Sequence, residues 1–167
     1  MRRVVILGSS GAGKSTFARA LGDKLGLPVV HLDALFWRPG WVEPDPEAFR
    51  AAVAAAIAGD AWVSDGNYAS RTFDLRLPRA DAVIFLHQPR WLCVLRILRR
   101  GLFSFGRRRP DLAEGCDENV EWNFFLWTWN FEARHRDRIL AAAEAYPTPI
   151  THLRGGRAMA RFLAEAT

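Results

Sequence analysis

Lysine and cysteine are both scarce in this sequence of 167 residues. Of its 23 Lys and Arg residues only Lys14 and Lys24 are lysines, so the other 21 are arginines. The two cysteines, Cys93 and Cys116, are too few for a disulfide framework and have no Cys or His neighbours at metal-ligand spacing. Both are therefore interpreted as packing or incidental thiols, and their low number favours a reducing compartment.

Long apolar runs are also missing. No stretch approaches the roughly 18 apolar residues that a membrane-spanning helix requires. The apolar run at residues 4–7 follows two arginines, as in a signal peptide, but it ends at Gly8. We therefore expect a cytoplasmic protein without a membrane partner, either a monomer or a homodimer.

Apolar and basic side chains are plentiful. Half of the residues are hydrophobic and 12% are aromatic, which is enough for the packed core of a single domain over residues 1–167. The 18 acidic residues leave a net charge of +5, which indicates an anionic partner. Arginine binds phosphates through a planar fork of donors. A GC-rich genome would also enrich Arg and Ala, so both explanations of the charge stay open.

Short apolar runs alternate with segments of helical spacing. This alternation predicts an α/β domain with a mostly parallel sheet. A helix from Pro46 to about residue 58 is expected to begin at an Asp45 cap. The predicted strands are residues 3–7, 28–32, 61–65, 82–86 and 149–153, and the other helices are residues 15–25, 71–77, 89–100, 117–145 and 156–165.

One segment interrupts this alternation. Residues 101–116 contain three glycines, a proline and an arginine triplet, and a long loop of this kind inside a compact domain is usually functional or disordered. The following helical region carries Trp122, Phe125, Trp129 and Ala133 at steps of three and four residues. We interpret these four residues as a stripe that faces the core, in preference to a surface that stacks bases.

A glycine-rich loop lies between the first predicted strand and helix. Residues 8–15 read Gly-Ser-Ser-Gly-Ala-Gly-Lys-Ser, the pattern of a phosphate-binding loop. Glycines let backbone N–H groups surround a phosphate, Lys14 would reach the β- and γ-phosphates, and Ser15 would ligate magnesium. The pattern therefore predicts binding of a nucleoside triphosphate. The residues expected to bind it are Gly8, Ser10, Gly11, Ala12, Gly13, Lys14, Ser15 and Thr16.

An acidic residue is needed to hold the magnesium ion from the other side. Functional groups of open parallel sheets gather at the carboxyl ends of the strands. Asp65 ends a predicted strand whereas Asp81 precedes one, so Asp65 is preferred as the metal-binding acid. Asp33 also follows a strand, and it is interpreted either as a base or substrate ligand, which we favour, or as a helix or turn cap.

The arginines separate the candidate classes of nucleotide-binding protein. A switch GTPase needs an Asn-Lys-x-Asp motif, which cannot occur because both lysines lie within the first 24 residues. A kinase instead surrounds the transferred phosphoryl group with cations and excludes water. Six arginines lie between residues 96 and 109, and we assign catalytic roles to Arg96, Arg100 and Arg109. Stabilisation of a helix C-terminus is the alternative role for one or two of these arginines.

Three further motifs lie outside the phosphate loop. They are His-Leu-Asp-Ala-Leu-Phe-Trp-Arg-Pro-Gly-Trp at residues 31–41, Asp-Gly-Asn-Tyr at 65–68 and Arg-Pro-Asp-Leu-Ala-Glu-Gly-Cys at 109–116. With these motifs the chain resembles the adenylate kinase-like superfamily of P-loop kinases, and more narrowly the bacterial topology-modulation (FlaR-related) and adenylate kinase-related proteins.

The resemblance implies a fold and a set of site residues. It implies a three-layer P-loop fold with a parallel sheet in the order 2-3-1-4-5, in which Asp65 is the Walker B acid and Asp33 contacts the phosphate acceptor. It further implies a lid at about residues 101–118. The loop that holds Arg154 and Arg157 would lie against adenine.

The sequence departs from the adenylate kinase pattern Asp-Gly-Phe-Pro-Arg, because the proline is absent and the arginine is displaced to Arg71. Phe36, Trp37 and Trp41 are interpreted as packing of a cap in preference to a surface that stacks a base or sugar. We predict a kinase that uses ATP and Mg²⁺ to phosphorylate a nucleotide, a nucleoside or another small acceptor. The alternative is a nucleotide-binding regulatory protein that acts on nucleic acid.

Overall fold

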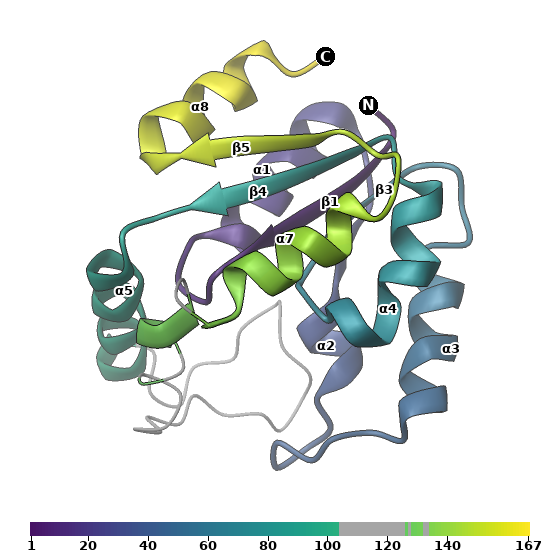
Figure 1. Cartoon of the computed structure of the whole chain (residues 1–167), viewed down its shortest axis with the longest axis horizontal. Helices are drawn as coiled ribbons and strands as arrows, with labels where there is room; N and C mark the ends of the chain where they lie inside the picture. The colour runs from purple at the N-terminus through teal and green to yellow at the C-terminus, as the bar shows by residue number, and fades with distance from the viewer. Residues whose placement is uncertain (104–125, 127, 132–133) are drawn as a thin grey trace.

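A computed structural model describes residues 1–103, 126, 128–131 and 134–167 of the chain. Its centre is a five-stranded, wholly parallel sheet in the order β2-β3-β1-β4-β5 (Figure 1). The strands are β1 (Arg3–Gly8), β2 (Val29–His31), β3 (Trp62–Asp65), β4 (Ala82–His87) and β5 (Ile150–Arg154). The α/β class and the strand order are therefore confirmed.

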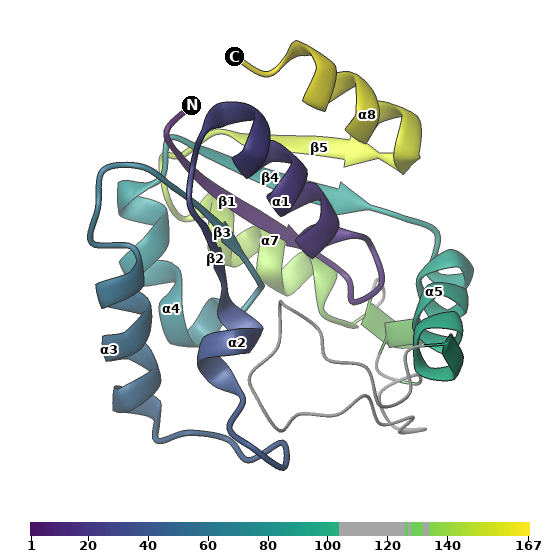
Figure 2. The ribbon, with the colours of Figure 1, turned by 180° about the vertical axis from the view of Figure 1, so that it is seen from behind.

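Helices cover both faces of the sheet and form the outer two of three layers. The described helices are α1 (Lys14–Leu25), α2 (Leu32–Phe36), α3 (Pro46–Ala56), α4 (Ala69–Arg76), α5 (Arg90–Phe103), α7 (Arg136–Glu144) and α8 (Gly155–Glu165), with a 3₁₀ turn η1 (Leu77–Arg79) after α4. One face packs on α1 and α8, and the other packs on α2, α3, α4 and α7. Figures 1 and 2 show these faces from opposite sides.

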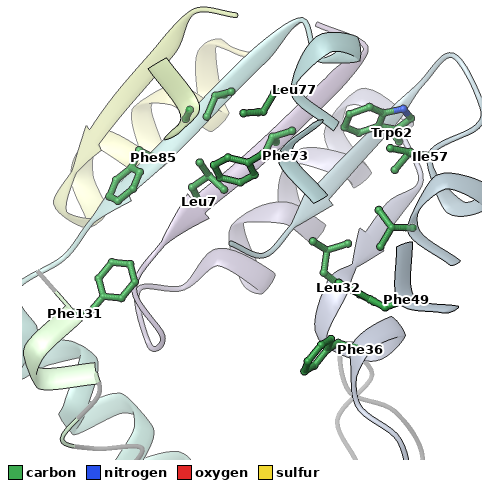
Figure 3. Packing of buried hydrophobic residues seen from close by; sticks show 14 residues of the cluster. Leu7, Leu32, Phe36, Phe49, Ile57, Trp62, Phe73, Leu77, Phe85 and Phe131 are labelled. Atoms are coloured by element: carbon green, nitrogen blue, oxygen red, sulfur yellow. The ribbon is translucent and has the colours of Figure 1, made fainter. Parts of the chain in front are cut away.

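Residues 4–7 of the central strand β1 are all apolar because this part of the strand is buried on both faces. Val5 and Leu7 belong to the core cluster under α4 and α7, in which Figure 3 labels Leu7, whereas Val4 and Ile6 belong to the cluster under α1 and α8. A half-buried strand would alternate apolar and polar residues instead. The unbroken apolar run therefore places β1, and the loop that follows it, at the middle of the sheet.

Several element boundaries differ from the prediction, most clearly at Leu32 and at the end of α5. Leu32, predicted to end the second strand, begins the short helix α2 and is completely buried. Helix α5 continues to residue 103, so it includes the first three residues of the predicted loop at 101–116. Gly101 does not end this helix because a glycine inside a helix costs only about 1 kcal/mol.

The aromatic stripe predicted to face the core is wrong at Trp129. This side chain is 42% exposed, and the guanidinium carbon of Arg90 lies 4.5 Å from its ring centroid. Phe131 is buried in the core instead. The cation–π contact with Arg90 explains how a large indole is accommodated at the surface. Trp122, Phe125 and Ala133 lie outside the described residues.

Cys93 is buried in the core, in agreement with its interpretation as a packing residue. Cys116, Arg109 and most of the predicted lid at residues 101–118 lie outside the described residues. Of the helices described, none has both the length and the apolar character needed to cross a membrane.

Candidate functional site

The phosphate-loop sequence connects the carboxyl end of β1 to the start of α1. Within the loop, the carbonyl oxygen of Ser9 accepts hydrogen bonds from the Ala12 amide at 3.2 Å and from Lys14 Nζ at 3.0 Å. Gly13 is the N-cap of α1 and has a left-handed backbone, and because it has no side chain it leaves the first N–H groups of the helix uncapped. The helix N-terminus thus presents N–H groups and a partial positive charge, which is the arrangement that binds an anion.

Two glycines of the loop are required by close packing. A Cβ atom on Gly8 would lie 2.7 Å from the carbonyl oxygen of Leu86 on β4, and one on Gly11 would lie 2.4 Å from the carbonyl oxygen of Cys93 on α5. Both residues also have a positive φ, which L side chains rarely adopt. The loop is therefore held between β4 and α5 with no room for a side chain at either position.

Asp65 lies at the carboxyl end of β3, beside the phosphate loop. β3 pairs with β1, and Asp65 is in register with Ile6. Its Oδ2 lies 3.0 Å from Nδ1 of His31, at the end of the neighbouring strand β2. Its Oδ1 is buried and has no hydrogen-bond partner among the residues described. The side chain therefore offers one fixed carboxylate oxygen and one oxygen ready for a cation or a water molecule.

Asn67 connects the turn after β3 directly to the phosphate loop. Its Oδ1 accepts a hydrogen bond from the Gly8 amide at 3.1 Å, and its Nδ2 donates one to the Gly8 carbonyl at 3.0 Å. The side-chain amide therefore binds both backbone groups of Gly8 as a neighbouring strand would. This contact fixes the position of Asp65 relative to the start of the phosphate loop.

Asp33 lies in the first turn of α2, directly after β2. Its Oδ1 accepts a 2.7 Å hydrogen bond from the hydroxyl of Tyr68. Burial raises the pKa of Tyr68 far above its ordinary value, and the charge of Asp33 raises it further, so the hydroxyl keeps its proton. Asp33 is thus an oriented carboxylate in the helix and not its N-cap, a position that His31 occupies.

An aromatic cluster adjoins Asp33. The ring of Tyr68 packs against Phe36 and Phe49, with centroids 4.8 and 5.1 Å apart. The guanidinium carbon of Arg71 lies 5.0 Å from the Phe36 centroid, and its Nη2 pairs with Glu43 at 3.0 Å. Arg71, the displaced arginine of the Asp-Gly-Asn-Tyr segment, is therefore held against the aromatic cluster by stacking and by an ion pair.

Trp37 and Trp41 extend the cluster from α2 into the following turn. Trp37 meets Phe36 and Trp41 edge to face, with centroids 4.9 and 5.3 Å apart. Trp41 has a left-handed backbone with φ 61°, which is uncommon for a bulky residue. The aromatic residues therefore pack on one another, as their interpretation as a packed cap expects.

The predicted basic residues divide into three groups. Arg96 Nη1 lies 3.3 and 3.4 Å from the carbonyl oxygens of Gly11 and Ala12, so this arginine of α5 contacts the phosphate loop. Arg154 ends β5 and Arg157 lies in the first turn of α8, and both are exposed. Arg100 lies on α5, one helical turn after Arg96.

Asp81 lies at the opposite edge of the sheet, as the sequence predicted. Its Oδ2 accepts hydrogen bonds from the backbone amides of Arg2 and Arg3, at 2.9 and 3.0 Å. The choice of Asp65 over Asp81 as the acid beside the phosphate loop therefore agrees with the geometry.

Sequence reasoning assigned no role to three residues that complete the site. His31, Asn67 and Tyr68 belong to two of the motifs that carry the resemblance, and each binds a residue that was singled out. The signal that could have found them is their position within three residues of Asp33 or Asp65, at the productive edge of the sheet.

No protein-family model matches the chain. The adenylate kinases of two Mycobacterium leprae strains, Br4923 and TN, are each 38% identical to it over 81 residues. This match spans 48% of the chain and 42% of each relative, so the chain covers less than half the length of these relatives.

Two solved structures share the fold over nearly the whole chain. A gluconokinase from Sinorhizobium meliloti 1021 aligns with a TM-score of 0.57 and 20% identity, and covers 99% of this chain and 89% of its own. A shikimate kinase from Acinetobacter baumannii, in complex with shikimate, aligns with a TM-score of 0.57 and 18% identity, and covers 96% and 88%. The chain therefore has the fold of these two kinases, with the 2-3-1-4-5 sheet that the resemblance to P-loop kinases implies, and over 81 residues it is similar in sequence to adenylate kinases.

Proposed function

We propose that this protein is an ATP-dependent kinase of a small molecule, built as a single domain over residues 1–167. The observation that carries the proposal is the pair of carboxylates at the ends of the neighbouring strands β2 and β3. Asp65, beside the phosphate loop, keeps a buried oxygen without a partner among the described residues, and Asp33 is oriented by a tyrosine hydroxyl. One acid is placed for the nucleotide and its metal, and the other for the acceptor.

The phosphate loop binds the triphosphate of ATP in this proposal. Lys14 exchanges its contact with the Ser9 carbonyl for the β- and γ-phosphates, and residues 8–16 supply the N–H groups around them. Arg154 and Arg157, at the junction of β5 and α8, lie against the adenine. These roles agree with the positions of all three residues at the carboxyl edge of the sheet.

The residues beside the loop also fit a magnesium ion. Mg²⁺ prefers carboxylate oxygens, water and phosphate oxygens, so Oδ1 of Asp65, which has no partner among the described residues, and the hydroxyl of Ser15 would hold it. When bound, the ion neutralises charge that develops on the phosphates. His31, hydrogen-bonded to the other oxygen of Asp65, keeps that carboxylate in one orientation.

Asp33 orients the attacking hydroxyl of the acceptor and accepts its proton. The hydrogen bond from Tyr68 occupies Oδ1 of Asp33 and fixes the plane of the carboxylate. The adjoining aromatic cluster bounds the acceptor site on one side. The acceptor is a small molecule with a free hydroxyl or phosphate group, in the class of nucleotides, nucleosides and other small metabolites.

Cations around the transferred phosphoryl group complete the proposal. Arg96 already contacts the carbonyl oxygens of the phosphate loop, and Arg100 follows it on the same helix. Arg109, with the lid proposed at residues 101–118, would supply further charge. Such cations stabilise the negative charge that is spread over the oxygens in the transition state.

The experiment compares the two lysines of the chain. Purified protein is incubated with ATP and Mg²⁺ and with a panel of nucleosides, nucleoside monophosphates, sugars and hydroxy acids, and acceptor-dependent release of ADP is measured. Lys14→Ala is expected to lower turnover by at least about 10²-fold, because the removed cation stabilises the transferring phosphates. Lys24→Ala is the control, since Lys24 binds the Ala164 carbonyl and lies outside the loop.

Equal turnover in the wild type and in folded Lys14→Ala would contradict the kinase assignment. Tight ATP binding without turnover of any acceptor would argue instead for a nucleotide-binding regulator. Circular dichroism of both variants confirms that a lost activity does not reflect a lost fold.

A further inference from the structure

Arg76 is the only arginine among the described residues that is completely buried. It lies at the end of α4, and its guanidinium donates to four acceptors. Nε binds Thr72 Oγ1 at 3.1 Å, Nη1 binds Ser64 Oγ at 3.1 Å and the Gly66 carbonyl at 2.9 Å, and Nη2 binds the Asn67 carbonyl at 2.5 Å. Three of these acceptors belong to residues 64–67, the end of β3 and the turn that follows it.

This turn connects Arg76 to both parts of the nucleotide site. The residues bound by Arg76 flank Asp65 on each side. Asn67, whose carbonyl accepts from Arg76, uses its side chain to bind both backbone groups of Gly8. A continuous series of hydrogen bonds therefore runs from Arg76 through the turn to the first residue of the phosphate loop.

Burial of the charged Arg76 side chain carries a desolvation penalty. Burial lowers the pKa of Arg76 to about 9, while the charge of Asp65 opposes this fall, so the guanidinium stays cationic at neutral pH. The desolvation of a buried ion costs several kcal/mol unless hydrogen bonds and an opposite charge compensate for it. The four acceptors, the nearby Asp65 and the Phe73 ring 5.3 Å away provide that compensation.

We propose that Arg76 is a positioning residue, which holds the turn at residues 65–67 so that Asp65 and the phosphate loop keep the separation that a metal–nucleotide complex requires. The proposal rests on the nucleotide site proposed above and adds a residue that does not touch the nucleotide. A hydrophobic side chain at this position would avoid the cost of burying a charge, but it would leave the Gly66 and Asn67 carbonyls without their donor.

Four variants separate positioning from general stability. Arg76→Met removes the charge and the donors at similar length, Arg76→Lys keeps the charge but loses the planar fork, and Asn67→Ala breaks the series beyond Arg76. Arg79→Met is the matched control. Arg79 lies three residues after Arg76 and, like it, donates several hydrogen bonds to the backbone. Its acceptors are the carbonyls of Ile57, Ala58 and Gly59, which follow the C-terminus of α3 and lie outside the turn at residues 65–67.

The first measurement needs no nucleotide. Amide hydrogen exchange of Gly8 is expected to accelerate about tenfold or more in Arg76→Met and in Asn67→Ala, and to change little in Arg79→Met. The second measurement is the affinity for ADP with and without Mg²⁺, taken well below the melting temperature. The gain in ADP affinity from Mg²⁺ is expected to fall about tenfold in Arg76→Met, less in Arg76→Lys, and not in Arg79→Met.

The proposal is overturned if folded Arg76→Met resembles Arg79→Met in both measurements, because Arg76 would then serve stability alone. If Arg76→Met does not fold, Arg76→Lys decides in the same way: exchange of Gly8 at the wild-type rate overturns the proposal, and faster exchange supports it. A wild-type protein that binds no ADP would contradict the proposed function. Hydrogen exchange at Gly8 would still test the role of Arg76 in holding the loop.

Discussion

His87 and His152 lie side by side at the ends of β4 and β5, with Nε2 of the first 2.9 Å from Nδ1 of the second. Burial, together with the smaller effects of the charges of Arg154, His152 and Arg136, lowers the pKa of His87 from 6.5 to about 4. His87 is therefore neutral in the folded protein at pH values where a histidine of the unfolded chain is already protonated.

This difference makes the stability of the fold depend on pH. Between pH 6.5 and about 4, His87 is protonated in the unfolded chain but neutral in the folded protein. The free energy of unfolding therefore falls as the pH falls through this window. His87→Gln, which keeps a donor for His152, is expected to show a smaller decline in melting temperature from pH 7 to pH 4. Melting curves of wild type and variant that stay parallel over this range would disprove the role of His87.

Single residues differ in how far the sequence predicts them. Asp65 could be chosen over Asp81 because the ends of parallel strands have distinct roles, and the sequence shows which end each residue occupies. The bond between Asn67 and Gly8 could not be foreseen, because it joins residues 59 positions apart through a side chain that replaces a strand. Likewise, the complete burial of Arg76 runs against the usual exposure of arginine.

At the scale of elements, local capping signals were sufficient to place α3. The side chain of Asp45 accepts a 3.0 Å hydrogen bond from the Ala48 amide, and Pro46 occupies the first helical position, as predicted. The packing of α5 against Gly11 was not predictable, because it depends on where the helix returns to the phosphate loop. Local chemistry thus fixed where α3 begins, whereas tertiary packing decided what α5 contacts.

The cap of α3 gives a prediction at this scale. Asp45→Ala is expected to lower the free energy of unfolding by about 1 kcal/mol, because the first turn loses its acceptor. Thermal melting measures this loss as a fall of about 2–4 °C for a chain of this size. Asp60→Ala removes another exposed carboxylate beyond the same helix and serves as the control. An equal loss in both variants would show that charge, and not capping, is responsible.

For the whole molecule, the alternation of strands and helices predicted the class of fold, whereas the strand order came from the resemblance to known kinases. Alternation alone does not reveal which strands are neighbours, since β1 pairs with β3 and β4 and not with β2. The nucleic-acid alternative, suggested by the net charge of +5, stays a prediction.

The proposed function predicts how a nucleotide affects global stability. A ligand that binds only the folded state at 100 times its Kd stabilises it by about 2.7 kcal/mol. Mg²⁺ and ADP at that concentration should therefore raise the melting temperature by about 5–11 °C. In Lys14→Ala the increase should be much smaller at the same concentrations, because the ammonium that meets the phosphates is missing. A full increase in this variant would contradict the assigned role of Lys14.

The central place of β1 also affects how the protein folds during synthesis. β1 pairs with residues 62–65 on one side and 82–86 on the other, so its two edges stay open until both partners have been made. At roughly 5–20 residues per second, translation leaves this apolar strand without partners for several seconds. The phosphate loop, although encoded near the start of the chain, therefore cannot take its final shape until residues 82–93 have been made.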